Sequence, residues 1–152
     1  MVRSEPTVFK ETAVEGKFSI PIPEYLSKTD SINPSALLQY QNAQEQVFLM
    51  VFAGIDTLHQ PMKEGFKRFA GEFVSRMEKG NMLNYHPEKI NGCEAILGDI
   101  RGRINETEVY YLLAMIRSGK YRYRIITGVS AQQKSKYKED LLEMIRGFKI
   151  RS

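Results

Sequence analysis

The residue types that most often carry chemistry are scarce in this chain of 152 residues. It has one cysteine, Cys93, and two histidines, His59 and His86. The spacings typical of zinc and calcium sites are missing, since there is no Cys-x-x-Cys, no His-x-x-x-His and no cluster of Asp and Asn in one loop. A cysteine nucleophile needs a nearby base, and the hairpin predicted below places His86 opposite Leu97, away from Cys93. We therefore interpret Cys93 as a plain strand residue and predict no metal and no cofactor.

Other catalytic motifs are also missing from the sequence. There is no Gly-x-Ser-x-Gly, the turn that holds the serine of many hydrolases. The run Gly98-Asp-Ile-Arg-Gly102 lies inside a strand pattern, whereas a phosphate-binding loop joins a strand to the N-terminus of a helix. Asp99 is flanked by apolar strand residues, and we interpret it as a position that faces solvent. The sequence thus predicts no catalytic residue and no enzyme.

The basic residues are gathered in the second half of the chain. Residues 1–76 carry 8 basic and 9 acidic groups, a net charge of −1, and residues 77–152 carry 14 and 9, a net charge of +5. The run Lys120-Tyr-Arg-Tyr-Arg124 has the composition of a single-stranded nucleic-acid site. In a strand, however, the tyrosines and the basic side chains of this run point to opposite faces, whereas base stacking and phosphate contacts need both on one surface. We predict no nucleic-acid partner and interpret the charge as solvated surface.

Size and composition indicate one globular domain. The chain has a mass of 17.5 kDa, with 42% hydrophobic and 26% charged residues, which is enough for a core without disulfides. No apolar run approaches the ~20 residues of a transmembrane segment, and residues 1–13 lack the apolar run of a signal peptide. We predict a single domain over residues 7–149, with residues 1–6 as a tail, that is cytoplasmic or exported with its signal segment removed.

The first half of the chain predicts four strands and a helix. The strands cover residues 7–12, 17–23, 36–41 and 46–54. Pro21 indicates an edge position or a strand end, and the run Val47–Phe52, apolar on both faces, indicates a central strand covered on both sides. Apolar residues at helical spacing predict a helix over residues 62–79, with Pro61 as its first residue and Gly80 just past its end.

The second half predicts two hairpins and a second helix. Asn91-Gly92 is a strong hairpin turn that pairs Ile90 with Cys93 and Tyr85 with Gly98. The strand that follows, residues 93–103, is expected to bend or bulge at Gly98 or Gly102. A turn at Ser118-Gly119 joins strands 108–117 and 120–128. The terminal helix covers residues 131–149, and Ser130 with Gln133 has the pattern of a capping box.

The second hairpin has two different faces. One is apolar or aromatic and predicts core: Tyr110, Leu112, Ala114, Ile116, Tyr121, Tyr123 and Ile125. The other has an apolar centre and a basic rim, as protein interfaces do. Its candidate partner-binding residues are Tyr111, Leu113, Met115, Arg122 and Arg124. Two alternatives remain open: one of the helices covers this face, or a second copy of the chain covers it and forms a homodimer.

This order of elements predicts an α+β fold, in which a largely antiparallel sheet of about six to eight strands carries two main helices as an αβα sandwich. Over about residues 7–149 the chain resembles the PsbP-like superfamily, which includes the extrinsic subunit of photosystem II, a Ran-binding nuclear-import factor, bacterial DcrB-like lipoproteins and secretion-effector chaperones. The segments that carry the resemblance are Phe18-Ser-Ile-Pro-Ile-Pro23, Tyr40-Gln-Asn42, Val47-Phe-Leu-Met-Val51, Asn91-Gly-Cys-Glu-Ala95, Tyr121-Arg-Tyr-Arg-Ile-Ile126 and Ile145-Arg-Gly-Phe-Lys149.

The resemblance implies an antiparallel sheet between helices and a role in protein contacts, without enzymatic activity. No manganese, chloride or Ran-binding motif of these proteins has a counterpart here. We therefore expect a protein-interaction module of a bacterial PsbP-like protein, with a protein partner of unknown identity. The alternative is a carrier of a small ligand or lipid, with a pocket between sheet and helix lined by Phe48, Phe52, Tyr110 and Phe69.

Overall fold

The computed structural model describes residues 6–55 and 60–151, which form ten strands and two α-helices. The elements follow the chain in the order β1 (Phe9–Val14), β2 (Phe18–Pro23), β3 (Ser27–Lys28), β4 (Leu38–Asn42), β5 (Val47–Ile55), α1 (Met62–Ser75), β6 (Glu78–Ile90), β7 (Cys93–Ile104), β8 (Thr107–Ser118), β9 (Tyr121–Ser130), a short 3-10 turn (Ala131–Gln133), α2 (Lys134–Arg146) and β10 (Lys149–Ile150).

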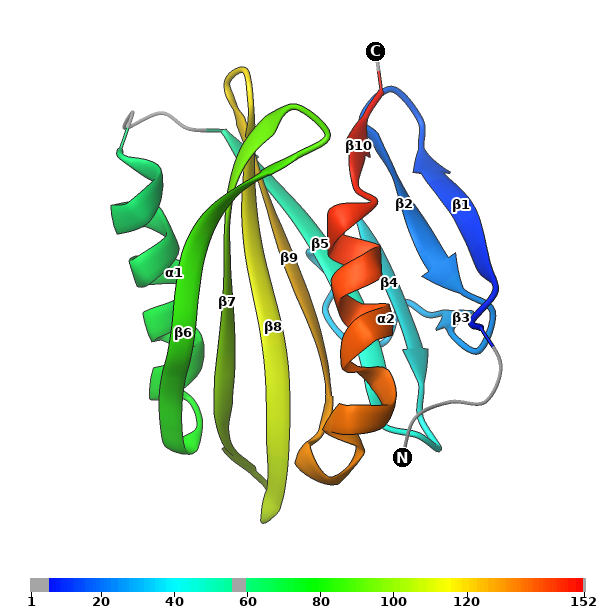
Figure 1. The fold of residues 1–152 in the computed structure, drawn as a ribbon, viewed down its shortest axis with the longest axis vertical. Coiled ribbons are helices and arrows are strands. Elements are labelled where there is room, and N and C mark those ends of the chain that lie inside the picture. Colours follow the sequence, from blue (N-terminus) through cyan, green and yellow to red (C-terminus); the bar gives the residue numbers. More distant parts are fainter. Residues whose placement is uncertain (1–5, 56–59, 152) are drawn as a thin grey trace.

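The strands form two antiparallel sheets (Figure 1). The large sheet has the order β3-β4-β5-β9-β8-β7-β6, and the small sheet has the order β1-β2-β10. The helices lie on opposite faces of the large sheet, and the small sheet lies beside α2. The predicted α+β class, the antiparallel sheet of six to eight strands and the two packed helices are therefore confirmed.

Two hydrophobic clusters fill the space on either side of the large sheet. Because side chains alternate along a strand, Val47, Leu49 and Val51 of β5 join the cluster under α2. Met50 joins the cluster under α1, whereas Phe48 and Phe52 are only partly buried on that side. The prediction of a central β5 is thus confirmed, but its full coverage on both faces is wrong.

The first helix ends earlier than its apolar pattern predicts. The helix ends at Ser75, and the chain turns into β6 at Glu78, so the predicted extension to residue 79 is wrong. Met77 still packs in the cluster under α1 and continues the apolar pattern past the helix. Gly80 lies in β6, where a Cβ atom would be 2.4 Å from the carbonyl oxygen of Val74, so glycine allows the strand to pack on the helix end.

The Asn91-Gly92 turn is confirmed with its register. Both residues have positive φ, 47° and 85°, and Ile90 pairs with Cys93 while Tyr85 pairs with Gly98. The irregularities of this hairpin are extra residues of β6, and one of the two register shifts lies opposite Gly102 of β7, one of the two predicted positions. Gly98 has another role, because a Cβ atom there would lie 2.8 Å from Cζ of Phe66 on α1.

The second hairpin differs from the prediction by one residue at its turn. Ser118 pairs with Tyr121, so the turn is Gly119-Lys120. Each residue of β8 therefore pairs with a residue of β9 two positions later than predicted. Because side chains alternate with a period of two, the predicted faces stay the same. A further tight turn at Asn105-Glu106, with φ of 50° and 68°, joins β7 to β8 and was not predicted.

The C-terminal segment contains a helix shorter than predicted. Residues 131–133 form a 3-10 turn, α2 covers Lys134–Arg146, and β10 follows. The capping box is wrong, since Ser130 makes no side-chain cap and Gln133 Nε2 donates to the carbonyl of Glu45 at 2.6 Å. The predicted inner stripe is buried, with Tyr137, Leu141, Met144 and Ile145 in α2 and Phe148 just past its end.

Candidate functional site

The α1 side of the β8–β9 hairpin holds the five residues predicted to bind a partner, and the structure buries three of them. Leu113, Met115 and Arg122 are 0%, 4% and 8% exposed beneath α1, and Tyr111 and Arg124 are half-buried. The prediction of one open surface made by all five is therefore corrected, and the alternative that helix 62–79 covers this face holds for three of the five residues.

Close helix packing explains the burial of Arg122. A Cβ atom at Gly65 of α1 would lie 2.4 Å from Arg122 Nη1, so glycine leaves room for the guanidinium. Arg122 Nη2 donates to the carbonyl oxygen of Gln60 at the start of the helix. This hydrogen bond gives the buried charge a polar partner, which buried charged groups require.

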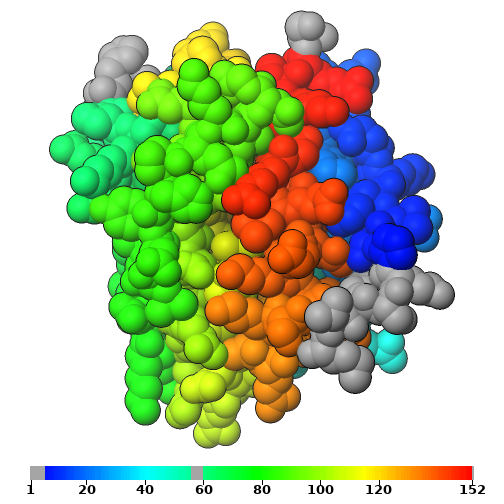
Figure 2. All heavy atoms as spheres, in the orientation of Figure 1, coloured from blue at the N-terminus to red at the C-terminus, as the bar shows by residue number. Residues whose placement is uncertain are grey.

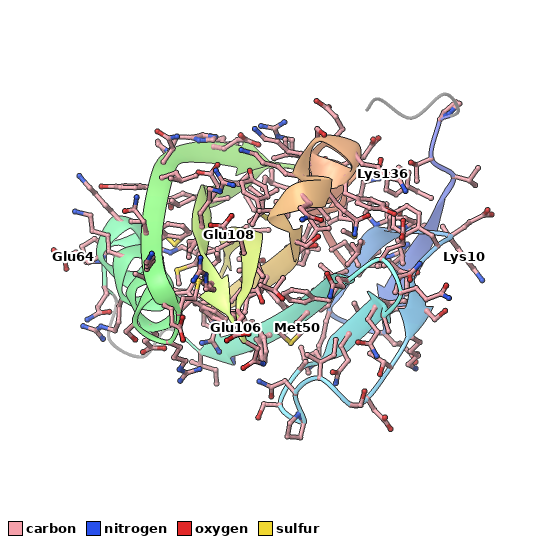
Figure 3. The ribbon with its side chains drawn as sticks, turned by 90° about the horizontal axis from the view of Figure 1, so that it is seen from below. Lys10, Met50, Glu64, Glu106, Glu108 and Lys136 are labelled. Atoms are coloured by element: carbon pink, nitrogen blue, oxygen red, sulfur yellow. The ribbon has the colours of Figure 1, made fainter. Side chains whose placement is uncertain are left out.

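The helix leaves part of this face open. The strongest contacts of α1 with the sheet are those with β6, β7 and β8, whereas Ile32 and Ala36, from the segment between β3 and β4, pack against the same cluster. We call Phe48, Phe52, Tyr111 and Arg124, all half-buried, the aromatic face. Met50 lies between Phe48 and Phe52 in the sequence of β5, and its side chain is buried. Figure 3 shows it on the side of the sheet opposite α2.

The rings at one end of the aromatic face are held by a glycine. Phe48 and Tyr111 meet edge to face, with centroids 5.1 Å apart and planes at 75°. A Cβ atom at Gly128 would lie 2.3 Å from Cδ1 of Tyr111 and 3.1 Å from Cε1 of Phe48. Tyr111 therefore lies over the glycine on the sheet, and its burial raises the pKa of its phenol.

A pocket of about 310 Å³ opens at this end of the aromatic face. Its apolar part contains Phe48 and Tyr111, and its rim carries amides and hydroxyls that can donate or accept hydrogen bonds. The lining residues are Gln46, Phe48, Ile104, Asn105, Thr107, Val109, Tyr111, Val129 and Ser130. Such a mixture suits an apolar side chain whose backbone is hydrogen-bonded at the rim.

Arg124 places a positive charge at the other end of the aromatic face. Its guanidinium carbon lies 5.6 Å from the ring centre of Phe52 and 5.9 Å from that of Phe69. Within residues 6–55 and 60–151 it forms no ion pair with a carboxylate. Two rings hold the cation in place, so this charge is oriented and available to an anionic group of a ligand.

The opposite face of the hairpin is core, as predicted, apart from Tyr121. Tyr110, Leu112, Ala114, Ile116, Tyr123 and Ile125 are buried, whereas Tyr121 is 39% exposed beside the turn. Tyr110 lies on the α2 side, whereas Phe69 and both phenylalanines of β5 lie on the α1 side. The predicted ligand pocket lined by Phe48, Phe52, Phe69 and Tyr110 is therefore wrong, because the sheet separates them.

The residues weighed for catalysis are held in ordinary contacts. His86 lies opposite Leu97, as predicted, and its Nε2 is 3.0 Å from Glu88 Oε1. Asp99, interpreted from the sequence as facing solvent, is half-buried and accepts hydrogen bonds from the backbone N–H of Asn84 and the hydroxyl of Tyr110, both at 3.1 Å. The turn between β7 and β8 brings Asp99 and Tyr110 together. Because this turn was not predicted from the sequence, neither was the hydrogen bond between them.

The remaining candidates have little chemistry around them. Cys93 is a half-buried free cysteine, and His59 lies outside the described residues. The described ranges contain no group of three His, Cys, Asp or Glu side chains placed to hold a metal ion. In the same ranges, neither helix has the length and apolar character of a membrane span.

The chain has the fold of the PsbP-like superfamily. No protein-family model and no curated sequence matches it, so the relationship rests on structure. The solution structure of cyanobacterial PsbP (CyanoP) from Synechocystis sp. PCC 6803 superposes with a TM-score of 0.73 at 10% identity, over 97% of this chain and 95% of that one.

Two further solved structures have the same fold. The Ran-binding protein Mog1p of Saccharomyces cerevisiae superposes with a TM-score of 0.69 at 14% identity, over 95% of this chain and 96% of that one. LpqN of Mycobacterium tuberculosis, involved in cell envelope biogenesis, superposes with a TM-score of 0.67 at 7% identity, over 100% of this chain and 89% of that one. At these identities the similarity establishes the fold alone.

Proposed function

We propose that this chain is a non-enzymatic protein-interaction module whose aromatic face holds an apolar, carboxylate-bearing segment of a protein partner. The observation that carries the proposal is Arg124, which two rings orient on a partly open apolar face without a carboxylate partner among the described residues. A carboxylate on the partner supplies the missing charge, and charge-assisted bonds of arginine to carboxylates are strong and directional.

The composition of the aromatic face supports a protein partner. Interface cores are enriched in Tyr, Phe, Met and Arg, and these residue types meet here in Phe48, Phe52, Tyr111 and Arg124, with Met50 beside them. The pocket beside Tyr111 receives one apolar side chain of the partner, as binding hot spots commonly do. One structural neighbour points in the same direction, since Mog1p is by its name a Ran-binding protein.

Selection from a random peptide library on the immobilised domain tests the proposal. We expect enriched peptides to combine aromatic or aliphatic residues with Asp or Glu. Their affinity should fall at least tenfold, about 1.4 kcal/mol, in Arg124→Glu. The matched control is Arg101→Glu, an exposed arginine on the α2 side of the same sheet, which should leave the affinity unchanged.

Arg122 is left intact in this experiment. Its guanidinium is buried and hydrogen-bonded to Gln60, so reversing its charge would disrupt the packing of α1 on the sheet as well as change the surface. Peptides that bind wild type and Arg124→Glu equally would contradict the proposal. Concentration-dependent self-association that Arg124→Glu abolishes would identify a second copy as the occupant and would equally contradict a separate partner.

A further inference from the structure

A second pocket, independent of the aromatic face, lies on the opposite side of the large sheet. It opens between α2 and strands β6 to β8 and has a volume of about 270 Å³. In Figure 2 this is the hollow between the orange surface of α2 and the green surface of β6 and β7. We call it the α2-side pocket; its lining is Asn84, His86, Leu97, Gly98, Asp99, Tyr110, Leu112, Lys138, Leu142 and Arg146.

One line of α2 faces this pocket. Lys138, Leu142 and Arg146 are spaced four residues apart and therefore share one side of the helix. Arg146 is already paired, because its Nε and Nη2 donate to the carboxylate of Glu88 at 2.9 and 3.1 Å. One turn before Lys138, the Nζ atom of Lys134 lies 4.4 Å from the ring centre of Tyr110.

Lys138 differs from these neighbours. Its side chain is half-buried, and within the described ranges it makes no hydrogen bond or ion pair. The matched lysine two residues earlier, Lys136, donates to Glu45 at 2.8 Å outside the pocket. The ammonium group of Lys138 is thus a charge on the pocket wall that an anionic ligand group can pair with.

Asp99 supplies the opposite charge on the sheet side of the same pocket. Each of its oxygens accepts one bond, from Asn84 N and from the Tyr110 hydroxyl. A carboxylate oxygen has two lone pairs, so Asp99 retains capacity for a donor from a ligand. Its two existing bonds fix its orientation, which is what a binding site requires of a polar group.

We propose that the α2-side pocket binds a small organic acid that also carries an ammonium or hydroxyl donor, of which an α-amino acid is the simplest example. Lys138 receives the acid group, Asp99 accepts the donor, and the leucines of the pocket contact the carbon skeleton. The volume of about 270 Å³ is just below the ~300–1,000 Å³ of ordinary ligand pockets, which favours a molecule of metabolite size.

Ligand titration of matched variants tests this site. The standard amino acids, lactate, malate and citrate are added singly at millimolar concentration, and the melting temperature and the heat of binding are measured. We expect at least one of them to raise the melting temperature of wild type and of Lys136→Ala. Lys138→Ala should weaken its binding at least tenfold.

Asp99→Asn then distinguishes the two kinds of donor. It should weaken an amino acid more than a hydroxy acid, because an ammonium loses a charge partner and a hydroxyl loses only part of an acceptor. No binding by any member of the panel, or equal binding by wild type and Lys138→Ala, would overturn the proposal. Since the site lies across the sheet from the aromatic face, either result leaves the peptide experiment unaffected.

Discussion

Gly128→Ala is the most direct perturbation of the aromatic face. In the wild type the ring of Tyr111 lies over Gly128 and meets Phe48 edge to face. The new methyl group would lie 2.3 Å from Cδ1 of Tyr111, whereas ordinary contacts begin at 3.4 Å, so the ring must move by about 1 Å. No such movement is needed in the backbone itself, because Gly128 does not have a positive φ.

The magnitude follows from two opposing effects. Overpacking of this kind costs about 1–3 kcal/mol. Replacing a strand glycine with alanine gains about 0.5–1 kcal/mol, because the unfolded chain loses conformational freedom. We therefore expect Gly128→Ala to lower the free energy of unfolding by about 1–2 kcal/mol.

A double-mutant cycle isolates the contact with Tyr111. Once Tyr111→Ala has removed the ring, Gly128→Ala should be neutral or stabilising, since only Phe48 must yield by a few tenths of an ångström. Urea unfolding of the four proteins gives the interaction energy between the two sites, which we expect to be about 2 kcal/mol. Additive effects of the two substitutions would refute the placement of Tyr111 over Gly128.

Two further predictions concern stability. Asn91→Gly keeps the positive φ of the turn but removes the bonds from Nδ2 to the carbonyls of Phe148 at 2.7 Å and Arg146 at 3.2 Å, so urea unfolding should show a loss of about 1–2 kcal/mol. The control Asn105→Gly, with φ of 50° and no side-chain bond among the described residues, should cost clearly less; equal losses would contradict a role of the Asn91 amide. Burial raises the pKa of four tyrosines in the folded protein. Above the ordinary value of 10.0 the unfolded chain therefore releases these protons first, and the free energy of unfolding should fall by about 1.4 kcal/mol per pH unit for each tyrosine. These are Tyr110, Tyr111, Tyr123 and Tyr137. Urea midpoints that stay constant above this pH would show that these phenols ionise in the folded protein.

Local signals in the sequence predicted local structure well. The turn at Asn91-Gly92 depends on residues that tolerate positive φ, so its position and the pairing of Tyr85 with Gly98 followed from the sequence. The faces of the β8–β9 hairpin also followed from the sequence, although the turn is displaced by one residue. The displacement shifts the pairing by two residues, which leaves the alternation of the side chains intact. The turn at Asn105-Glu106 was missed, since Glu carries no comparable preference for positive φ.

Long-range packing was beyond the reach of the sequence. The apolar pattern of α1 shows which side of the helix is buried but not which strands it covers. Whether Met115 is open or buried depends on that choice. Gly65 and Gly98 allow the close approach that decides it, and neither has a pattern that identifies its partner in advance. The Asp99–Tyr110 bond likewise joins two strands across a turn that was not assigned.

Methionine methyl resonances test the central claim, which is that a partner docks on the aromatic face. Met50 lies on this side of the sheet (Figure 3). Met144 lies in the cluster under α2, so each methionine reports on one face. When a selected peptide is titrated into the methyl-labelled domain, we predict that the signal of Met50 shifts and that of Met144 does not. A shift of Met144 with an unchanged Met50 would place the binding site on the α2 side and contradict the proposed docking surface.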